Sequence, residues 1–445
     1  MSIHDHQIAD LLQKHMALYG YELIDLPIIE PADLFLIKAG DPIISSLFTF
    51  ERQNHQFALR PEFTAGAASH YTRLFGNQSP MARWQYHGPI FQDPPGNGSS
   101  TYQHYSIGAE LIGMGGAIAD AEIISMSAHG LTAVGVSDFQ LTIGHTGLTR
   151  RLLSRFQLDA RIERFLLHHS AILQDPGHGK SHLVAQLKRL YAPEQAASSA
   201  DEILQFQLDK STDFIGGRSR QDIARRLLQK RKGAAAWEQI IAATDFLDQW
   251  GQIAGPPPQV WDRMRDLIGA SDEVSQQILA EFQSVINLLE ICGIPAEQMR
   301  IKPSLARSWE YYTGIVFELA SRDGINVGGG GRYNELIQLI SQHPATPAVG
   351  FAYNMINLAR AIGEIAHTTN PPMQLYITPT AHQAGMRWAH LLRQQQVATA
   401  ITSDVAAQTT APLRIDETGN CHARQRIYTL DEIEQLVAEL KEVKQ

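Results

Sequence analysis

Acidic, hydroxyl and guanidinium side chains interrupt apolar, strand-like stretches of the sequence. Glu62 and Thr64 follow one such stretch, Glu110 lies inside a second, and Arg307 stands just before Tyr311–Glu318. A carboxylate among apolar neighbours must be paired or hydrogen-bonded, because burying it alone is costly. These side chains could form an internal structural network. They could equally line a pocket for a zwitterion, with carboxylates facing its ammonium group and the guanidinium facing its carboxylate. The residue types leave both interpretations open.

Other chemical motifs are absent or incomplete. The run Gly328–Gly331 is followed by no Lys-Ser or Lys-Thr and opens no GxGxxG, so we expect a close backbone approach to a ligand or a neighbouring strand. None of the 18 histidines stands at a recognisable metal-ligand spacing, and no serine-hydrolase elbow occurs. Cys292 and Cys421 are far apart and form no CxxC. We therefore expect no metal, no cofactor and no serine-hydrolase site.

Composition limits the class of protein. The chain has 445 residues, and its 37 basic against 46 acidic side chains give a formal net charge of −9. With 44% hydrophobic and 19% charged residues, it has enough apolar material to fold into two or three domains. The thin negative charge argues against a nucleic-acid binder. Since the sequence has no apolar stretch of membrane-spanning length and no leader-like start, we expect a cytoplasmic protein that binds no membrane.

Hydrophobic periodicity predicts the elements that position the polar residues. Residues 1–146 combine helical repeats, as in Thr64–Phe75, with strands at hairpin-like separations. Examples are Trp84–Phe91 with Tyr102–Leu111, and Phe48–Phe50 with Gln56–Arg60, which the polar turn Arg52–His55 joins. This pattern predicts an antiparallel β-sheet flanked by helices, an α+β fold. We expect the chain to divide into a first part of this core (1–146), a mostly helical insertion (147–300), a second part of the core (301–367) and a small C-terminal α/β domain (373–445).

Several segments resemble, in order and spacing, the histidyl-tRNA synthetase group of class II synthetase-like proteins. The resemblance covers residues 1–365. It implies a six-stranded antiparallel sheet, dimerisation through the first helix and strand, and a pocket of histidine size. Residues 373–445 resemble a truncated anticodon-binding domain that lacks its middle strand and helix. The segments that carry the resemblance are Gly20–Phe35, Ala58–Ala65, Gly88–Phe91, Gly108–Gly113, Arg307–Glu318, Gly330–Tyr333 and Ala348–Ala352.

The same resemblance implies a histidine pocket made of seven residues. Separate groups would hold the amino, imidazole and carboxylate groups of the ligand. One departure is Ser106, which stands where the family has a glutamine near the amino group. The implied residues are Glu62 and Thr64 for the α-amino group, Glu110 and Tyr312 for the imidazole, Arg307 for the carboxylate, and Tyr311 and Tyr333 around the ring.

The ATP site of the family is the larger departure. In an active synthetase of this group, an arginine and a glutamate closely follow the position of Phe91, and the loop after them carries further basic residues that bind ATP. Another arginine stands at the position of Asn357. Neutral side chains cannot pair bidentately with triphosphate oxygens, and losing one such contact typically costs about 2.7 to 4 kcal/mol. The resemblance therefore implies that aminoacylation is lost. The positions concerned hold Gln92, Pro94, Ser100, Tyr102 and Asn357.

A kept histidine pocket beside a lost ATP site resembles a paralogous family, the regulatory subunits of ATP phosphoribosyltransferase. Tyr311–Glu318 and Gly216–Ile223 are also similar to that family. The resemblance implies a non-catalytic subunit for the first step of histidine biosynthesis, with histidine as feedback effector. Its partner would be the short-form catalytic subunit of ATP phosphoribosyltransferase, bound by a homodimer within a hetero-oligomer. No tRNA partner is expected.

Two alternatives stay open. The paralogous family usually lacks an anticodon-like domain, so residues 373–445 leave room for a catalytically inactive synthetase-like protein that binds tRNA or another protein. A divergent histidyl-tRNA synthetase that still works is the third interpretation, and it rests on the amino-acid pocket alone.

Overall fold

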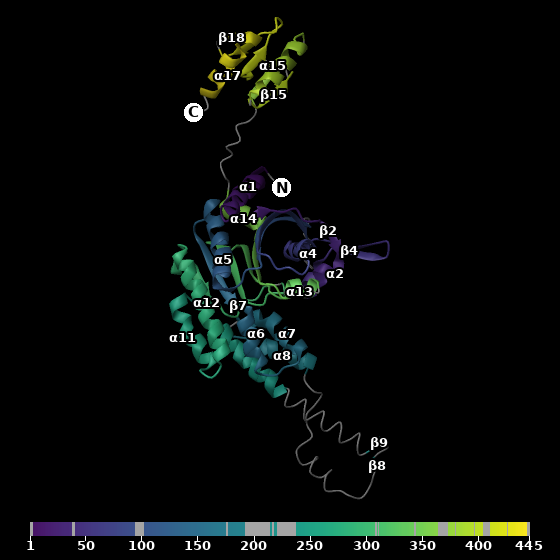
Figure 1. The fold of residues 1–445 in the computed structure, drawn as a ribbon, viewed down its shortest axis with the longest axis vertical. Coiled ribbons are helices and arrows are strands. Elements are labelled where there is room, and N and C mark those ends of the chain that lie inside the picture. Colours follow the sequence, from purple (N-terminus) through teal and green to yellow (C-terminus); the bar gives the residue numbers. More distant parts are fainter. Residues whose placement is uncertain are drawn as a thin grey trace. The chain divides into compact units, whose positions relative to one another are not determined.

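The computed structural model forms two compact units, residues 1–364 and residues 365–445, which we describe separately (Figure 1). Pro94 and Ser100 lie outside the described residues, as does most of the run 216–223. The structure describes residues 3–37, 41–93, 102–174, 177–191, 214–215, 218–219, 237–307, 309, 311–341, 344–363, 373–378, 380–395, 397–403, 410–424 and 426–442.

The first unit is built on an eight-stranded sheet. Its six inner strands are antiparallel, as expected, and two short edge strands, β1 and β10, add to them by parallel pairing with β5 and β7. The expected six-stranded sheet is thus two strands too small. From edge to edge the strands are β1 (Glu22–Leu23), β5 (Ala82–Phe91), β6 (Gln103–Ile112), β13 (Ala348–Asn354), β12 (Asn326–Arg332), β11 (Ile315–Ser321), β7 (Phe139–His145) and β10 (Met299–Ile301).

Both faces of this sheet are covered, because alternate residues of each strand are apolar on each side. On one face, Trp84 and Val316 pack with side chains of α4 and α13. On the other face, Tyr353 reaches α5, where its hydroxyl donates to the Ser127 carbonyl at 2.5 Å. The helices around the sheet are α1 (Ile3–Leu18), α4 (Thr64–Phe75), α5 (Gly116–Ala133), α13 (Leu336–Ile340) and α14 (Met355–Ile362).

A small three-stranded sheet, β2-β4-β3, lies beside α2 and α4. The β3–β4 hairpin has the turn expected from its polar sequence, with Gln53 and Asn54 both at positive φ. Arg60, at the end of β4, donates to the carbonyl oxygens of Leu26 at 2.6 Å and Pro89 at 2.8 Å, which joins this sheet to β5. The elements are β2 (Ile29–Pro31), α2 (Ala32–Leu36), α3 (Asp41–Ser46), β3 (Thr49–Arg52) and β4 (His55–Leu59).

The chain after β7 is mainly helical. Leucines at three- and four-residue spacing, such as Leu166, Leu183 and Leu187, form one apolar cluster among its helices. The last helix of the region, α12, packs along α5 of the core (Figure 1). The limits of the insertion, residues 147 and 300, stay a prediction. The described elements are α6 (Thr146–Ser154), α7 (Ala160–His169), η1 (Ser170–Gln174), α8 (Gly179–Tyr191), β8 (Phe214–Ile215), β9 (Arg218–Ser219), the helical stretch 237–251, α11 (Pro257–Ile268) and α12 (Glu273–Ile291).

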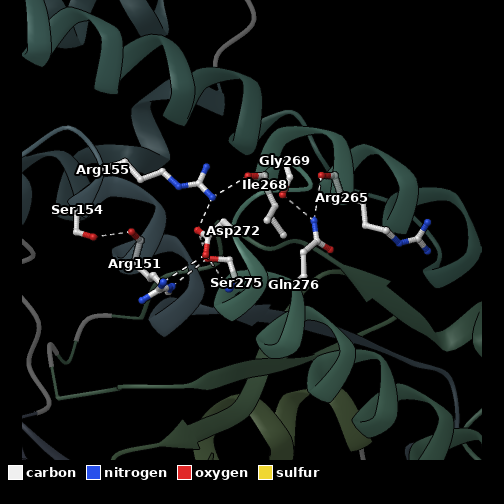
Figure 2. Close-up of polar contacts among 9 residues, drawn as sticks. All are labelled: Arg151, Ser154, Arg155, Arg265, Ile268, Gly269, Asp272, Ser275 and Gln276. Atoms are coloured by element: carbon white, nitrogen blue, oxygen red, sulfur yellow. Dashed lines mark hydrogen bonds and ion pairs between the residues drawn. The ribbon is translucent and has the colours of Figure 1, made fainter.

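A carboxylate ties α6 to the start of α12 (Figure 2). Asp272 is the N-cap of α12 and accepts from the backbone N–H of Ser275 at 3.0 Å. Arg151 of α6 and Arg155, the C-cap residue of that helix, donate to its two oxygens at 3.2 and 2.5 Å. Arg155 also donates to the Ile268 carbonyl at 2.7 Å. The hydrogen bonds from Arg155 and Ser275 hold the pKa of Asp272 well below its ordinary value. We call Arg151, Arg155 and Asp272 the helix clamp.

The second unit has a five-stranded sheet in the order β15-β14-β16-β17-β18. Strands and helices alternate in its first half, as expected of a small α/β domain, and the antiparallel β17–β18 hairpin follows. A cluster of apolar side chains around Trp388 and Leu436 forms its core. No helix in the described part of either unit is both long and apolar enough to cross a membrane. The elements are β14 (Met373–Ile377), α15 (His382–Gln394), β15 (Thr399–Thr402), β16 (Leu413–Ile415), β17 (Cys421–Ala423), β18 (Arg426–Tyr428), η3 (Leu430–Glu432) and α17 (Ile433–Glu442).

Candidate functional site

The centre of the candidate site is Glu110, a fully buried residue of β6. One oxygen of its carboxylate, Oε1, accepts from the hydroxyls of Thr64 at 2.8 Å and Tyr86 at 2.9 Å. The other, Oε2, accepts from the hydroxyl of Tyr333 at 2.6 Å. Three of roughly four acceptor positions are therefore used. Burial raises the pKa of Glu110 to about 7, although the three hydroxyls oppose that shift.

Glycines on the neighbouring strands make room for the predicted site residues. A β-carbon on Gly350 would stand 1.6 Å from Oε2 of Glu110, one on Gly331 would stand 2.9 Å from Tyr312 Cδ1, and one on Gly329 would meet Nη1 of Arg307. Gly329 and Gly331 belong to the run whose backbone we expected to approach a ligand or a strand. No residue with a side chain fits at Gly350 unless Glu110 moves.

Glu62 lies two residues before α4, and its side chain accepts hydrogen bonds from the N-terminal backbone of that helix. Its carboxylate accepts from the backbone N–H of Thr64 and, at 2.8 Å, from that of Ala65. These N–H groups have no partner within the helix, so Glu62 satisfies them. Burial raises the pKa of Glu62 to about 7, and its charge in turn raises the pKa of Glu110. The charge of Glu62 is therefore felt at Glu110.

Three tyrosines of the predicted pocket, Tyr311, Tyr312 and Tyr333, pack together on the same face of the sheet. Tyr311 packs edge-on against Tyr333, with ring centroids 5.8 Å apart, and its ring centroid is 4.8 Å from that of Tyr312. All three are at least 92% buried. Burial is the main cause that raises the pKa of each of them above the ordinary value. At Tyr333 the next cause is the negative charge of Glu110. With a raised pKa, each of the three phenols keeps its proton, and the hydroxyl of Tyr333 donates to Glu110.

Arg307 lies over the same face of the sheet as Glu110, but above β11 rather than β6. Its Nη1 donates to the Phe317 carbonyl at 3.1 Å and is 3.4 Å from a carboxylate oxygen of Glu318 in β11. Between β6, which carries Glu110, and β11 lie β13 and β12, so their backbones are about 14 Å apart at ordinary strand spacing. Arg307 and Tyr312 line the same cavity, and the positive charge of Arg307 opposes the burial that raises the pKa of Tyr312. The structure thus brings all seven predicted pocket residues to one face.

The donors to Glu62 and Glu110 are all neutral. Backbone amides serve Glu62, and three hydroxyls serve Glu110; no arginine, lysine or histidine of the described residues donates to either. Other buried acids differ: Asp120 accepts from Arg332 at 2.8 Å, and Glu30 accepts from Arg73. The fold therefore leaves two adjacent carboxylates without a cation, which suits a ligand with an ammonium or imidazolium group.

The positions of the predicted ATP site that are described carry neutral side chains, two of which donate to backbone carbonyls. Gln92 follows β5, and its amide donates to the Pro61 carbonyl at 2.9 Å, next to Glu62. Asn357 in α14 donates to the Asn326 carbonyl at 2.8 Å. Tyr102 is half exposed, with its ring against Phe48. Pro94 and Ser100 lie outside the described residues. Ser106 in β6 is buried, and its hydroxyl is 3.4 Å from the Tyr353 carbonyl.

Sequence analysis missed two residues of the site, Tyr86 and Gly350. Tyr86 donates to Glu110, and its ring stacks on Phe63 with centroids 4.4 Å apart. Strand alternation places Tyr86 and Trp84 on one face of β5, but only the β5–β6 register, which pairs Trp84 with Glu110, shows that this is the face of Glu110. No group of three His, Cys, Asp or Glu in the described ranges is placed to hold a metal ion.

Comparison with known proteins gives one family. The sequence model described as histidyl-tRNA synthetase matches residues 3–210 and 216–358. A histidine-tRNA ligase of Methanococcus maripaludis is 28% identical over 351 residues, which are 77% of this chain and 68% of that protein. A histidine-tRNA ligase of Pyrococcus furiosus is 25% identical over 404 residues, or 88% of this chain and 81% of that protein.

Solved structures show the same fold. One, described as an ATP phosphoribosyltransferase regulatory subunit/histidyl-tRNA synthetase from Bacillus halodurans, is 20% identical with a TM-score of 0.65 and covers 92% of both chains. The apo histidyl-tRNA synthetase of Staphylococcus aureus is 20% identical with a TM-score of 0.60, over 97% of this chain and 95% of that one. The antiparallel-rich sheet, flanking helices and small C-terminal α/β domain are those of the histidyl-tRNA synthetase-like fold.

Proposed function

Since the chain belongs to the histidyl-tRNA synthetase family, we propose that it binds histidine at Glu62 and Glu110 and acts as a non-catalytic regulatory subunit of ATP phosphoribosyltransferase. Its partner is a short-form catalytic subunit that carries out the first step of histidine biosynthesis. Histidine is then a feedback effector, and the protein acts in the cytoplasm.

The observation that carries the histidine site is the pair of buried carboxylates without a cation. Glu62 and Glu110 are surrounded by neutral donors, and each has acceptor positions left. A zwitterion with an α-ammonium and a basic imidazole supplies the missing charge. Arg307, on the same face, supplies the guanidinium for its carboxylate. In this proposal Thr64, Tyr312 and Tyr333 orient the ligand, and Tyr311 closes the pocket around the ring.

Loss of adenylate chemistry is supported by Gln92 and Asn357. Both amides are neutral and both are used to bind backbone carbonyls of the protein itself. Neither can neutralise charge that develops on a triphosphate. The Bacillus halodurans structure is described as an ATP phosphoribosyltransferase regulatory subunit/histidyl-tRNA synthetase, so its description is compatible with either role.

The homodimer is supported by exposed apolar side chains on the first helix and strand. Leu18 of α1 is 85% exposed and Leu23 of β1 is 54% exposed. Burying such side chains between two copies is favourable by about 25 cal/mol per Å² of apolar area. A Leu18→Glu variant should shift the protein from dimer toward monomer in light scattering, and an unchanged mass would contradict this interface.

Feedback requires that histidine distinguish two states of the complex, since equal affinity for both shifts nothing. The direct test mixes the purified protein with a short-form ATP phosphoribosyltransferase. We expect the rate of phosphoribosyl transfer to ATP to rise on mixing and to fall again when histidine is added. No change in rate on mixing would overturn the regulatory role while leaving the histidine site open to its own test.

That second test is calorimetry with histidine. The Glu110→Gln variant keeps the size of the side chain but removes its charge, and we expect histidine binding to weaken by about tenfold or more. Glu297→Gln, at an exposed glutamate just before the edge strand β10, is the matched control and should bind as the wild type does. If the wild-type protein binds no histidine, the carboxylates form a structural network only.

A second candidate is a working histidyl-tRNA synthetase, which the names of the curated relatives favour. Histidine-dependent exchange between ATP and pyrophosphate separates the two. We expect no exchange above background with the wild-type protein, and clear exchange would favour the synthetase. An inactive synthetase-like protein that binds tRNA is disfavoured by the net charge of −9, and a gel-shift titration with tRNA at physiological salt tests it.

A further inference from the structure

A cavity of about 270 Å³ lies beside the candidate site, between helices α6 and α7 and the segment of residues 304–312. Helix α7 lines it with positions 160, 163, 164, 167 and 168, which form one face of a helix. Arg307 and Tyr312 stand at its border with the face that holds Glu110. The polar residues used in the argument below are Thr146, Arg150, Arg164, His168, Ser304 and Arg307.

The charge of the lining is positive in a chain that is negative as a whole. The lining contains three arginines, Arg150, Arg164 and Arg307. It contains one acid, Glu163, so its formal charge is 3 − 1 = +2 with His168 neutral. The whole chain carries −9. Guanidinium groups bind phosphate and carboxylate groups through planar pairs of N–H donors. Low-dielectric walls around such a lining strengthen its field for an anion.

Unpaired polar atoms concentrate at the same cavity. Among the described residues, eight buried side-chain nitrogen or oxygen atoms have no hydrogen-bond partner, and three of them belong to lining residues: Thr146 Oγ1, Ser304 Oγ and Arg307 Nε. Native proteins pair the large majority of such atoms, because an unpaired one costs about 1 to 3 kcal/mol. All three can donate a proton, so a ligand with acceptor oxygens matches them.

We propose that this cavity binds a small metabolite through a phosphate or carboxylate group. Arg164 and Arg150 neutralise the anion, and the hydroxyls of Thr146 and Ser304 donate to its oxygens. Trp309 and Tyr312 also line the cavity and offer aromatic surface to the uncharged part of the ligand. The site is distinct from Glu62 and Glu110, whose carboxylates would repel an anion.

Calorimetry in a buffer free of phosphate and carboxylate tests the proposal with three probes: inorganic phosphate, pyrophosphate and citrate. We expect at least one to bind the wild-type protein with a Kd in the millimolar range or tighter. Binding of the phosphates assigns a phosphorylated ligand, and binding of citrate assigns a carboxylate. If none of the three binds at millimolar concentration, the proposal is wrong.

Variants on one helix make the test specific. Arg164→Gln should weaken the bound anion by about tenfold or more, since a charge-assisted hydrogen bond is lost. Arg161→Gln changes the same residue type three positions earlier in α7, where the side chain is exposed and does not line the cavity. Equal weakening by both variants would show a non-specific effect of charge and would overturn the site.

Two further measurements separate this site from the proposed histidine pocket and from a structural role. Glu110→Gln should weaken histidine and leave the anion bound, whereas Arg164→Gln should do the reverse, so either proposal can fail alone. Ser304→Ala removes an unpaired buried hydroxyl, so thermal unfolding of the free protein should not fall while anion affinity does. Mole-for-mole displacement of the anion by histidine would contradict a separate site.

Discussion

Glu110 and Asp272 accept similar numbers of hydrogen bonds in the same unit, yet their surroundings differ. Glu110 is fully buried and accepts from three neutral hydroxyls. Asp272 keeps 19% of its side chain exposed and accepts from two arginines and from Ser275. Burial raises the pKa of Glu110 to about 7, whereas hydrogen bonds led by that from Arg155 lower the pKa of Asp272.

The difference separates a carboxylate that holds the fold together from one that awaits a charge. In the helix clamp, the cations that balance Asp272 come from the protein, so the charge contributes to stability. At Glu110 the protein supplies no cation, so the charge is tolerated at a cost that a cationic ligand would remove. A buried acid with only neutral donors is therefore the stronger sign of a binding site.

The largest expected loss of stability comes from a substitution that disrupts the candidate site itself. Gly350→Ala places a β-carbon 1.6 Å from Glu110 Oε2, so the carboxylate must leave its three hydroxyls. We expect the free energy of unfolding to fall by about 4 kcal/mol, from overpacking and from the broken buried network. Chemical denaturation measures it. Gly251→Ala is the control, since nothing lies within 4 Å of its β-carbon and the helix should gain slightly.

Removing the acid of the helix clamp should have the next largest effect. Asp272→Ala loses the N-cap of α12 and both arginine partners, and we expect a loss of about 2 kcal/mol in the free energy of unfolding. Asp272→Asn keeps a capping oxygen and should lose less. No loss in Asp272→Asn would mean that the cap alone matters and that the charge pairing with Arg151 and Arg155 adds nothing.

The two carboxylates should respond to pH in opposite directions. Because burial raises the pKa of Glu62 and Glu110 from 4.5 to about 7, the folded protein binds more protons than the unfolded chain between these values. Stability should then rise by about 1 kcal/mol or more on going from about pH 8 to about pH 5, as these groups gain protons. Since the pKa of Asp272 is below its ordinary 3.8, the stability it contributes is present above that value and disappears at lower pH.

Variants assign the two pH windows. In Glu110→Gln the gain between about pH 8 and about pH 5 should shrink, while in Asp272→Asn the loss below about pH 4 should shrink. Thermal unfolding across this range gives both curves. A Glu110→Gln profile identical to that of the wild type would show that the site carboxylates titrate normally.

The smallest effect is expected at an exposed ion pair. Arg265 and Asp262 form an i,i+3 pair in α11 at 2.5 Å, but both side chains are about half exposed or more. Arg265→Ala should change the free energy of unfolding by less than about 0.5 kcal/mol. A loss as large as that of Asp272→Ala would show that exposure does not separate the helix clamp from an ordinary surface pair.

The sequence by itself determined the local elements and the types of residue in the site. Thr64–Phe75 is a helix with the predicted bounds, and the β3–β4 hairpin has its predicted turn, because periodicity and turn residues act over a few neighbours. The resemblance likewise implied six antiparallel strands, which are the inner strands of the sheet, and its seven candidate residues lie on one face of that sheet. The short edge strand β10 and the β17–β18 hairpin have too few residues to show a period.

Only the tertiary structure decided how the site is balanced. The sequence left a structural network and a ligand pocket equally possible, because it does not say which donors meet which acid. Strand register brings Gly350 beside Glu110 and places Tyr86 within reach, and loop path sends Arg307 to Glu318. These contacts join residues far apart in the chain, and charge balance depends on such distances, so no local pattern contains it.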